Sequence, residues 1–398
     1  MSFLLGVAIF VVALLISVML HEAGHFATAK LFGMKVTQFF VGFGQTIWST
    51  KKGETEYGIK AIPAGGFNKI VGMTELDEVD PADEPRSFRR QAGWKRIVVL
   101  AAGSFMHFVL ALFLLFVVAA GIGLETISST TTIGAIEACV PKNVNSSCVS
   151  GDPSSPAKKA GLRAGDKIVS ISGVPVHNSW NEMGKAIRSL TPGEPATVVV
   201  ERNGHLVTLH PSFARLDGKG TYLGVAPQTT FKRSGPVSAV SYAAREWWTM
   251  VAGSAQVAAN LPKAVPHLFT DLFSRNRAST PGGQVTGLVG AGDVTGQVVA
   301  AHIGWQPKAD LVLLIIASLN IFVGLFNLLP LLPMDGGHIA VVIYERVRAW
   351  LARLRGRPDP GPANYRGLIP VSVGVFALLV GVSLLLIVAD IVNPIHIQ

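Results

Sequence analysis

The chain has 398 residues, of which 49% are hydrophobic and only 15% are charged. Soluble domains carry about 25% charged residues, so this composition excludes an ordinary soluble domain and indicates membrane-spanning segments. The net charge of +9 does not indicate a nucleic-acid partner, because the basic residues form no single patch and no nucleic-acid-binding module is recognisable.

The first predicted element, residues 1–31, is a transmembrane helix that carries the motif His-Glu-Ala-Gly-His near its end. Residues 3–20 contain no charge, and the run lacks the basic start and the cleavage site of a signal peptide, so we expect it to be retained. His21 and His25 are four positions apart and share one helix face, where two neutral imidazoles make half of a tetrahedral zinc site. Glu22 is then placed to take a proton from water at the metal.

Residues 32–96 are predicted to form a segment on the cytoplasmic side that contains a β-hairpin. Two stretches rich in β-forming residues, 36–49 and 56–67, flank a Lys-Lys-Gly-Glu turn. Several aromatic residues fit a hairpin that enters the protein beside the metal motif, with an edge that accepts an extended substrate strand. They fit equally well a solvent-side hairpin with a small hydrophobic face of its own.

Residues 97–124 are the second predicted transmembrane helix, which contains Ser104 and His107. A lone histidine in a helix bonds a neighbouring helix more often than it binds a metal. We therefore favour that bond over metal binding for His107.

Residues 125–230 have the composition of a soluble α+β module, with an Asn-Gly hairpin turn near its end. The module resembles a PDZ domain of bacterial membrane and periplasmic proteases, and PDZ domains bind extended peptides by strand addition. The alternative is a β-module that only spaces the helices apart or blocks access. Cys139 and Cys148 fit no zinc-finger spacing; they form a disulfide if their loop faces an oxidising exterior, and otherwise remain two free thiols.

The third predicted transmembrane helix, residues 311–338, carries a polar residue, Asn327, and then Pro330 and Pro333, which break a helix. Broken backbone at membrane depth is tolerated only where protein or a wet cavity covers it. Asp335 comes at the end of this irregular stretch and is well placed to be the third metal ligand. A plain Asp-Gly-Gly turn is the weaker interpretation, because the histidine pair needs one more ligand.

The remaining ranges complete the predicted topology. Residues 231–310 are predicted to form an interfacial helix and a Gly-rich linker, 339–367 a cytoplasmic basic loop, and 368–392 a fourth transmembrane helix. Basic residues concentrate in 81–96 and 339–357, which places both on the cytoplasmic side of a cell membrane. The N-terminus and the PDZ-like module are then extracytoplasmic, and the metal motif lies near the cytoplasmic face.

These elements predict a polytopic α-helical membrane protein of about four transmembrane helices, with a membrane-associated β-hairpin and an extracytoplasmic α+β PDZ-like domain. The two motifs in the first and third helices, with the PDZ-like module between the second and third, resemble the site-2 protease family of intramembrane zinc metalloproteases. The resemblance is greatest to the bacterial regulator-of-sigma branch, in its actinobacterial form. It implies one Zn²⁺ held by His21, His25 and Asp335, a general base, Glu22, and a substrate-binding set of Asn327, Gly65, Gly66 and Phe67.

One departure concerns the head of the second helix. Relatives often carry Gly-Pro and then Asn there, whereas this chain has Gly103, Ser104 and His107. The departure leaves the role of this helix in substrate handling open, but not the metal site.

The resemblance also implies a reaction and its partners. The substrates are single-span membrane proteins such as anti-sigma factors, cut within their transmembrane segment after an upstream site-1 protease has trimmed them. The setting is the lipid bilayer of a bacterial plasma membrane, with no nucleic acid involved. A metal transporter and a catalytically inactive PDZ scaffold are the alternatives. Polar groups at only one membrane depth argue against the transporter, and a glutamate between the histidines argues against the scaffold.

Overall fold

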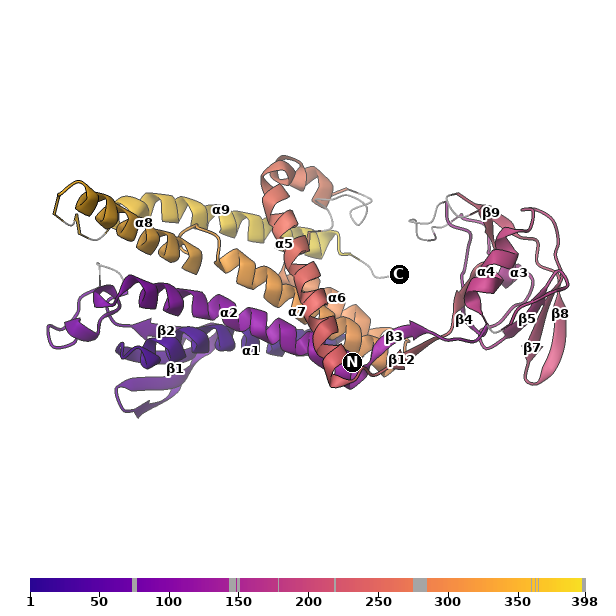
Figure 1. The fold of residues 1–398 in the computed structure, drawn as a ribbon, viewed down its shortest axis with the longest axis horizontal. Helices are drawn as coiled ribbons and strands as arrows, with labels where there is room; N and C mark the ends of the chain where they lie inside the picture. The colour runs from indigo at the N-terminus through magenta and orange to yellow at the C-terminus, as the bar shows by residue number, and fades with distance from the viewer. Residues whose placement is uncertain are drawn as a thin grey trace. The chain divides into compact units, whose positions relative to one another are not determined.

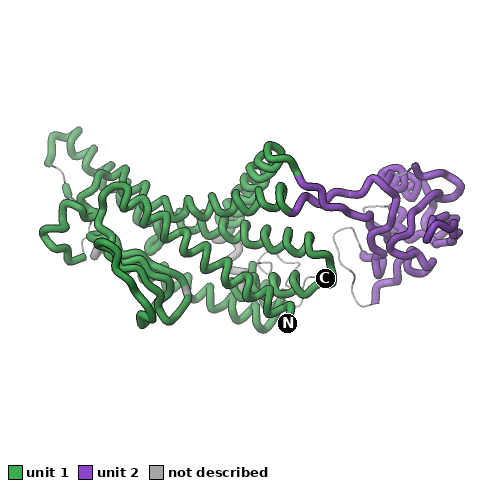
Figure 2. Tube along the Cα trace, turned by 90° about the horizontal axis from the view of Figure 1, so that it is seen from below, with its two compact units in different colours: residues 1–121, 234–397 green, residues 122–233, 398 purple. Residues whose placement is uncertain are grey.

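The computed structural model describes residues 1–73, 77–142, 148, 151–177, 179–217, 220–274, 285–358, 360, 361, 363 and 365–395. The chain divides into two compact units (Figure 2): a helical unit of residues 1–121 and 234–397, and a smaller β-rich unit of residues 122–233. Figure 1 labels the helices and most of the strands of both units.

Four helices of the first unit are long and apolar enough to cross a membrane. In the first of these helices only 17% of the most apolar 18-residue window is buried, and in the fourth helix 0% is buried. The exposed apolar side chains of both helices therefore need lipid around them. The chain is therefore a polytopic membrane protein, as the composition predicts. The four are Ser2–Leu31 (α1), Gly93–Ile122, which joins α2 (Gly93–Val117) to a π-helical turn (Val118–Ile122), Trp305–Asn327 (α7), and Gly367–Val392 within α9 (Tyr365–Val392).

The third span ends earlier than the predicted range of 311–338. α7 ends at Asn327, and α8 (Asp335–Leu354) begins after a short irregular segment. Pro330 and Pro333 have no backbone N–H to donate, so a continuous helix through this segment would lose hydrogen bonds. Asp335 therefore comes directly after an irregular stretch, as the two prolines predict, and begins α8.

Two stretches predicted as connections are helical. α8 occupies much of the predicted basic loop at 339–367, where it packs against α2 through a buried stripe. α6 (Leu288–Ala300) lies within the predicted linker, after the long helix α5 (Pro236–Leu272). Glycine weakens an isolated helix, but here it allows contact, since a Cβ at Gly296 would lie 2.6 Å from the ring of Phe3 on α1.

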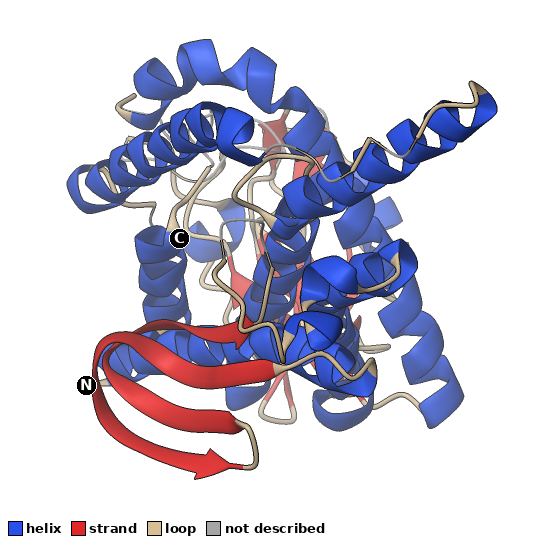
Figure 3. Cartoon of the chain, turned by 90° about the vertical axis from the view of Figure 1, so that its left-hand side faces the viewer, coloured by secondary structure: helices blue, strands red, loops and turns tan. Residues whose placement is uncertain are grey.

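A long β-hairpin lies beside α1. Strand β1 (Val36–Lys52) turns into β2 (Thr55–Ile70), and the hairpin folds over on itself (Figure 3). Phe40 is therefore paired with both Phe67 and Gly58. The bend falls at Gly42, whose positive φ of 84° suits glycine and whose missing Cβ would otherwise lie 2.6 Å from a backbone oxygen. Two short 3₁₀ turns, Glu84–Arg86 and Phe88–Arg90, connect the hairpin to α2.

The second unit is built on a four-stranded antiparallel sheet in the order β6-β5-β7-β8. β7 and β8 meet across Asn203 and Gly204, both with positive φ, as an Asn-Gly hairpin turn requires. Ile168, Val200 and Phe213 are fully buried in its core. The elements of the unit are β3 (Leu124–Ile127), β4 (Ile133–Ile136), α3 (Pro156–Lys159), β5 (Lys167–Ile171), β6 (Val174–Pro175), α4 (Trp180–Arg188), β7 (Val198–Arg202), β8 (His205–Leu209), β9 (Ala214–Leu216), β10 (Gly220–Tyr222), β11 (Val225–Pro227) and β12 (Thr229–Lys232).

Candidate metal centre

α1 supplies the two histidines. The helix runs without interruption through the motif, so His21 and His25 project from one face, one turn apart. Both residues are buried, with exposed fractions of 9% and 6%. Their Nε2 atoms lie 3.1 Å apart. Two imidazoles of the same helix therefore present neighbouring nitrogens to one point.

The α7–α8 junction supplies the carboxylate. Asp335 is the first residue of α8, and the two glycines that follow it allow the helix to begin against the preceding irregular segment. A Cβ at Gly336 would lie 2.2 Å from the carbonyl oxygen of Leu328, and a Cβ at Gly337 would lie 2.6 Å from the carbonyl carbon of Leu331. Any larger side chain would push α8, and Asp335 with it, out of place.

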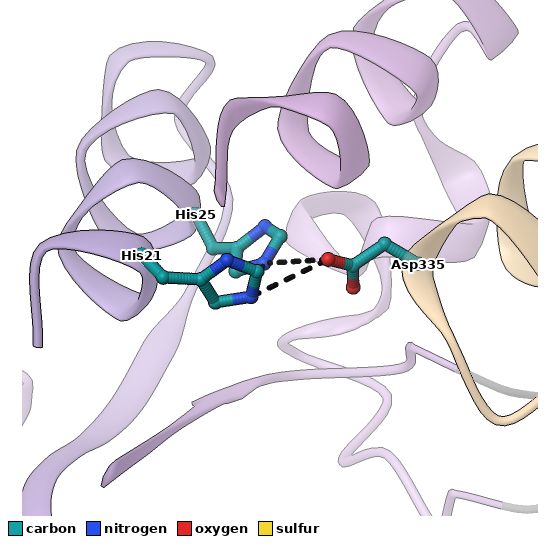
Figure 4. A group of neighbouring side chains, drawn as sticks. All are labelled: His21, His25 and Asp335. Carbon is teal, nitrogen blue, oxygen red and sulfur yellow. Dashed lines mark hydrogen bonds and ion pairs between the residues drawn. The ribbon is translucent and has the colours of Figure 1, made fainter. Parts of the chain in front are cut away.

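The three side chains converge (Figure 4). Asp335 Oδ2 lies 3.4 Å from His21 Nε2 and 3.4 Å from His25 Nε2. Donor atoms about 2.05 Å from a tetrahedral zinc are about 3.3 Å from one another. The three atom-to-atom distances therefore match one face of a zinc tetrahedron.

The protonation pattern also fits a cation. His25 Nδ1 lies 2.7 Å from the carbonyl oxygen of Val99, which can only accept, so Nδ1 carries the proton and Nε2 presents a lone pair. Asp335 Oδ2 is buried and accepts no hydrogen bond from any described residue. Lone pairs that face one another away from water are costly unless a positive charge lies among them. His21, His25 and Asp335 thus fit a zinc ion.

α2 closes one side of this group. A Cβ at Gly103 would lie 2.4 Å from His25 Nε2, and a Cβ at Gly24 would lie 2.5 Å from the carbonyl oxygen of Ala102. Only glycine at these positions lets α1 and α2 approach closely enough for α2 to cover the imidazoles. The sequence analysis names Gly103 only as part of a stretch that departs from a family pattern at Ser104 and His107. A glycine in each of two predicted spans is the signal that would have found the contact.

His107, on α2, contacts a neighbouring helix and also the group of His21, His25 and Asp335, called the metal group below. Its ring centroid lies 5.1 Å from that of His21. Its Nδ1 lies 2.8 Å from Asn320 Oδ1 on α7, and Asn320 Nδ2 donates to the carbonyl of Ile316. The amide orientation fixed by Ile316 makes His107 Nδ1 the donor. This is the helix-to-helix bond that the sequence favours. Ser104 is buried, and its hydroxyl bonds no described residue.

Glu22 has a partner that the sequence analysis missed. Asn68 Nδ2, on β2, donates to Glu22 Oε2 over 2.6 Å and reaches the Glu22 carbonyl oxygen at 3.4 Å. The two residues are 46 positions apart, and an asparagine in a strand carries no motif. Its place directly after the predicted substrate-binding run Gly65-Gly66-Phe67 is the only hint in the sequence.

Three of the predicted substrate-binding residues, Gly65, Gly66 and Phe67, directly precede Asn68 in β2. A Cβ at Gly66 would lie 3.5 Å from Glu22 Cγ, and Gly65 has a positive φ of 131°. The ring of Phe67 stacks on that of Phe40, with centroids 5.6 Å apart. Asn327 is half-buried at the end of α7 and makes no hydrogen bond to His21, Glu22, His25 or Asp335, all of which the structure describes.

The second unit contains the two cysteines and a groove. Cys139 and Cys148 form a disulfide, with Cα atoms 5.8 Å apart. The groove has a volume of about 440 Å³ and lies between α4, with Trp180 and Met183, and residues 221–225. Its lining residues belong to a different compact unit from His21, His25 and Asp335.

Comparison with known proteins identifies similar chains. The model of the family described as Peptidase family M50 matches residues 9–357 of this chain. The zinc metalloprotease Rip1 of Mycobacterium tuberculosis is 38% identical to this chain. The match covers 100% of this chain and 99% of Rip1. Rip1 of Mycobacterium bovis is likewise 38% identical. Rip1 of Mycolicibacterium smegmatis is 36% identical, with both chains covered completely.

Proposed function

The chain belongs to peptidase family M50, and from that premise we propose how its residues perform the reaction. The protein is a membrane-embedded zinc metalloendopeptidase of the site-2 type. We assign His21, His25 and Asp335 as the zinc ligands and Glu22 as the general base. The observation that carries this assignment is the convergence of three electron-pair donors, with atom-to-atom distances of 3.1, 3.4 and 3.4 Å.

The chain's own residues divide the chemistry among them. When bound, zinc supplies a Lewis acid that polarises the scissile carbonyl and makes water more acidic. His21, His25 and Asp335 would hold the ion, and three protein ligands are the number typical of catalytic zinc sites. Glu22 takes the proton of the attacking water through the carboxylate oxygen that Asn68 leaves available, and then delivers it to the leaving amine.

The substrate must enter as an extended strand. A peptide bond inside a helix is shielded by its own hydrogen bonds, so the helix has to unwind before attack. The segment of β2 around Gly65, Gly66 and Phe67 is beside Glu22, and its backbone offers replacement hydrogen bonds. Asn327, at the end of α7, offers a side-chain amide for the same purpose.

We further propose single-span membrane proteins, such as anti-sigma factors already cut by a site-1 protease, as the substrates. The unit of residues 122–233 is then a PDZ-like module on the extracytoplasmic side of a bacterial plasma membrane. Its Cys139–Cys148 disulfide suits an oxidising compartment, and its groove suits either peptide binding or the exclusion of untrimmed substrates by size.

One experiment tests the reaction against its alternatives. Purified protein is incubated with single-span peptides, with and without a chelator, while bound zinc is measured. We expect about one zinc per chain and one chelator-sensitive cut inside the peptide's apolar segment. Bound zinc without cleavage would contradict the protease, and zinc uptake into vesicles that contain the protein would then separate a transporter from a scaffold.

A further inference from the structure

We propose that Asn68 is a positioning residue for Glu22, through which the β-hairpin sets the orientation of the catalytic carboxylate. The inference rests on the proposed role of Glu22 as the general base. It goes further in assigning a function to a side chain outside the metal motif, on a different element and 46 positions away.

The direction of the hydrogen bond is determined by its acceptors. Asn68 Nδ2 faces both Glu22 Oε2, at 2.6 Å, and the Glu22 carbonyl oxygen, at 3.4 Å. Neither oxygen of an ionised glutamate can donate, so the amide nitrogen of Asn68, and not its oxygen, must point toward Glu22. The amide therefore donates to one carboxylate oxygen and leaves the other free to receive a proton.

The backbone around Asn68 holds the donor in place. Asn68 is paired with Phe39 in the hairpin sheet. Two positions earlier, a Cβ at Gly66 would lie 2.8 Å from the sulfur of Met19 and 3.5 Å from Glu22 Cγ. β2 thus packs on the turn of α1 that carries the motif, so the amide is preorganised and does not swing in from solvent.

This arrangement connects two parts of the proposed reaction. The strand segment proposed to pair with unwound substrate is the same segment that orients the base. A carboxylate held by a single charge-assisted hydrogen bond keeps one rotamer, which a flexible glutamate at a wet site would not. Asn68 therefore affects the chemical step and not the holding of metal.

Three substitutions at position 68 separate positioning from packing. Asn68→Asp keeps the shape but removes the donor, Asn68→Ala removes both, and Asn68→Gln restores an amide on a longer side chain. We expect kcat to fall by about 10- to 100-fold in the first two, with zinc content and KM nearly unchanged, and a partial recovery with Gln. The matched control is Lys69→Gln, on the next residue of β2, whose side chain points to the other face of the strand.

Different experimental results would contradict the positioning role of Asn68 in different ways. Wild-type kcat in Asn68→Asp would overturn it, and loss of zinc or a rise in KM alone would reassign Asn68 to a structural or substrate-binding role. A thermal-unfolding cycle of Asn68→Ala, Glu22→Ala and the double variant adds a measurement that needs no catalysis. We expect Asn68→Ala to lower the unfolding midpoint less when Glu22 is already absent, and additive shifts would deny the contact.

The same set distinguishes this inference from the assignment of the base. If Glu22→Gln remains active, the proposed function of Glu22 is wrong whatever Asn68 does. If Glu22→Gln is inactive and Asn68→Asp behaves as wild type, only the positioning role is wrong.

Discussion

The two sides of the metal group are built differently. On one side, a single uninterrupted helix holds His21 and His25, and the spacing within that helix fixes their separation. On the other side, Asp335 stands at the start of α8, where a broken chain and two glycines bring it to the histidines. The first side depends on local helix geometry and the second on close packing. Substitutions that affect one side only should therefore have different consequences.

The largest effect is expected from removal of a ligand on either side. His21→Ala and Asp335→Ala should each lose most of the bound zinc, and cleavage should fall by at least about 10³-fold, because two remaining ligands do not hold the ion. Metal analysis of the purified variants, together with the peptide cleavage assay, measures both. If Asp335→Ala kept a full complement of zinc, the α8 side would not belong to the metal site.

Glu22→Gln should leave both sides of the metal group intact while it stops the cleavage reaction. The amide keeps the size of the side chain but cannot take a proton, so cleavage should fall by about 10²- to 10⁴-fold while zinc is retained. Zinc content and single-turnover cleavage are measured on the same sample. An active Glu22→Gln protein would overturn the assignment of the base.

A glycine substitution tests the α8 side alone. Gly336→Ala places a Cβ where the Leu328 carbonyl oxygen is 2.2 Å away, so α8 must shift, and zinc affinity should weaken by at least about tenfold. The control is Gly374→Ala in α9, where a Cβ meets no atom within 4 Å and a small gain of about 0.5–1 kcal/mol in stability is expected. Equal zinc affinity in both variants would show that packing at this junction does not position Asp335.

The same contrast explains what could be predicted from the sequence. The spans and the histidine pair follow from local hydropathy and helical spacing. Asp335 could be proposed only because a metal motif elsewhere needed one more ligand. Asn68 could not be predicted, because its contact with Glu22 depends on how a folded-over hairpin lies against α1. α6 was missed because glycine argues against a helix until the close contact with Phe3 is known.

His107 tests whether α2 adds a third side to the metal group. His107→Leu should leave zinc content unchanged, but it leaves the buried Asn320 Oδ1 without its donor, at a cost of about 1–3 kcal/mol in stability. The double variant with Asn320→Leu removes both partners and should recover much of that loss. Loss of zinc in His107→Leu would instead make His107 a ligand, and the comparison of two sides would no longer hold.

The smallest effect is expected where the hairpin meets the end of α1. Glu54 accepts hydrogen bonds from Arg86 and from Lys30. These bonds, with that of Arg86 the stronger influence, hold the pKa of the Glu54 carboxyl at about 2. Because the folded-state pKa is depressed, the stabilisation is fully present above the ordinary pKa of about 4.5 and is lost as pH falls toward 2. These groups are partly solvated, so Glu54→Gln should cost about 1 kcal/mol or less at pH 7. Thermal unfolding at pH 7 and pH 3 should show the difference between wild type and variant shrinking at the lower pH. If the difference in unfolding midpoint between wild type and Glu54→Gln instead grew at pH 3, the charge of Glu54 would not attach the hairpin to the end of α1. The same hairpin carries Asn68.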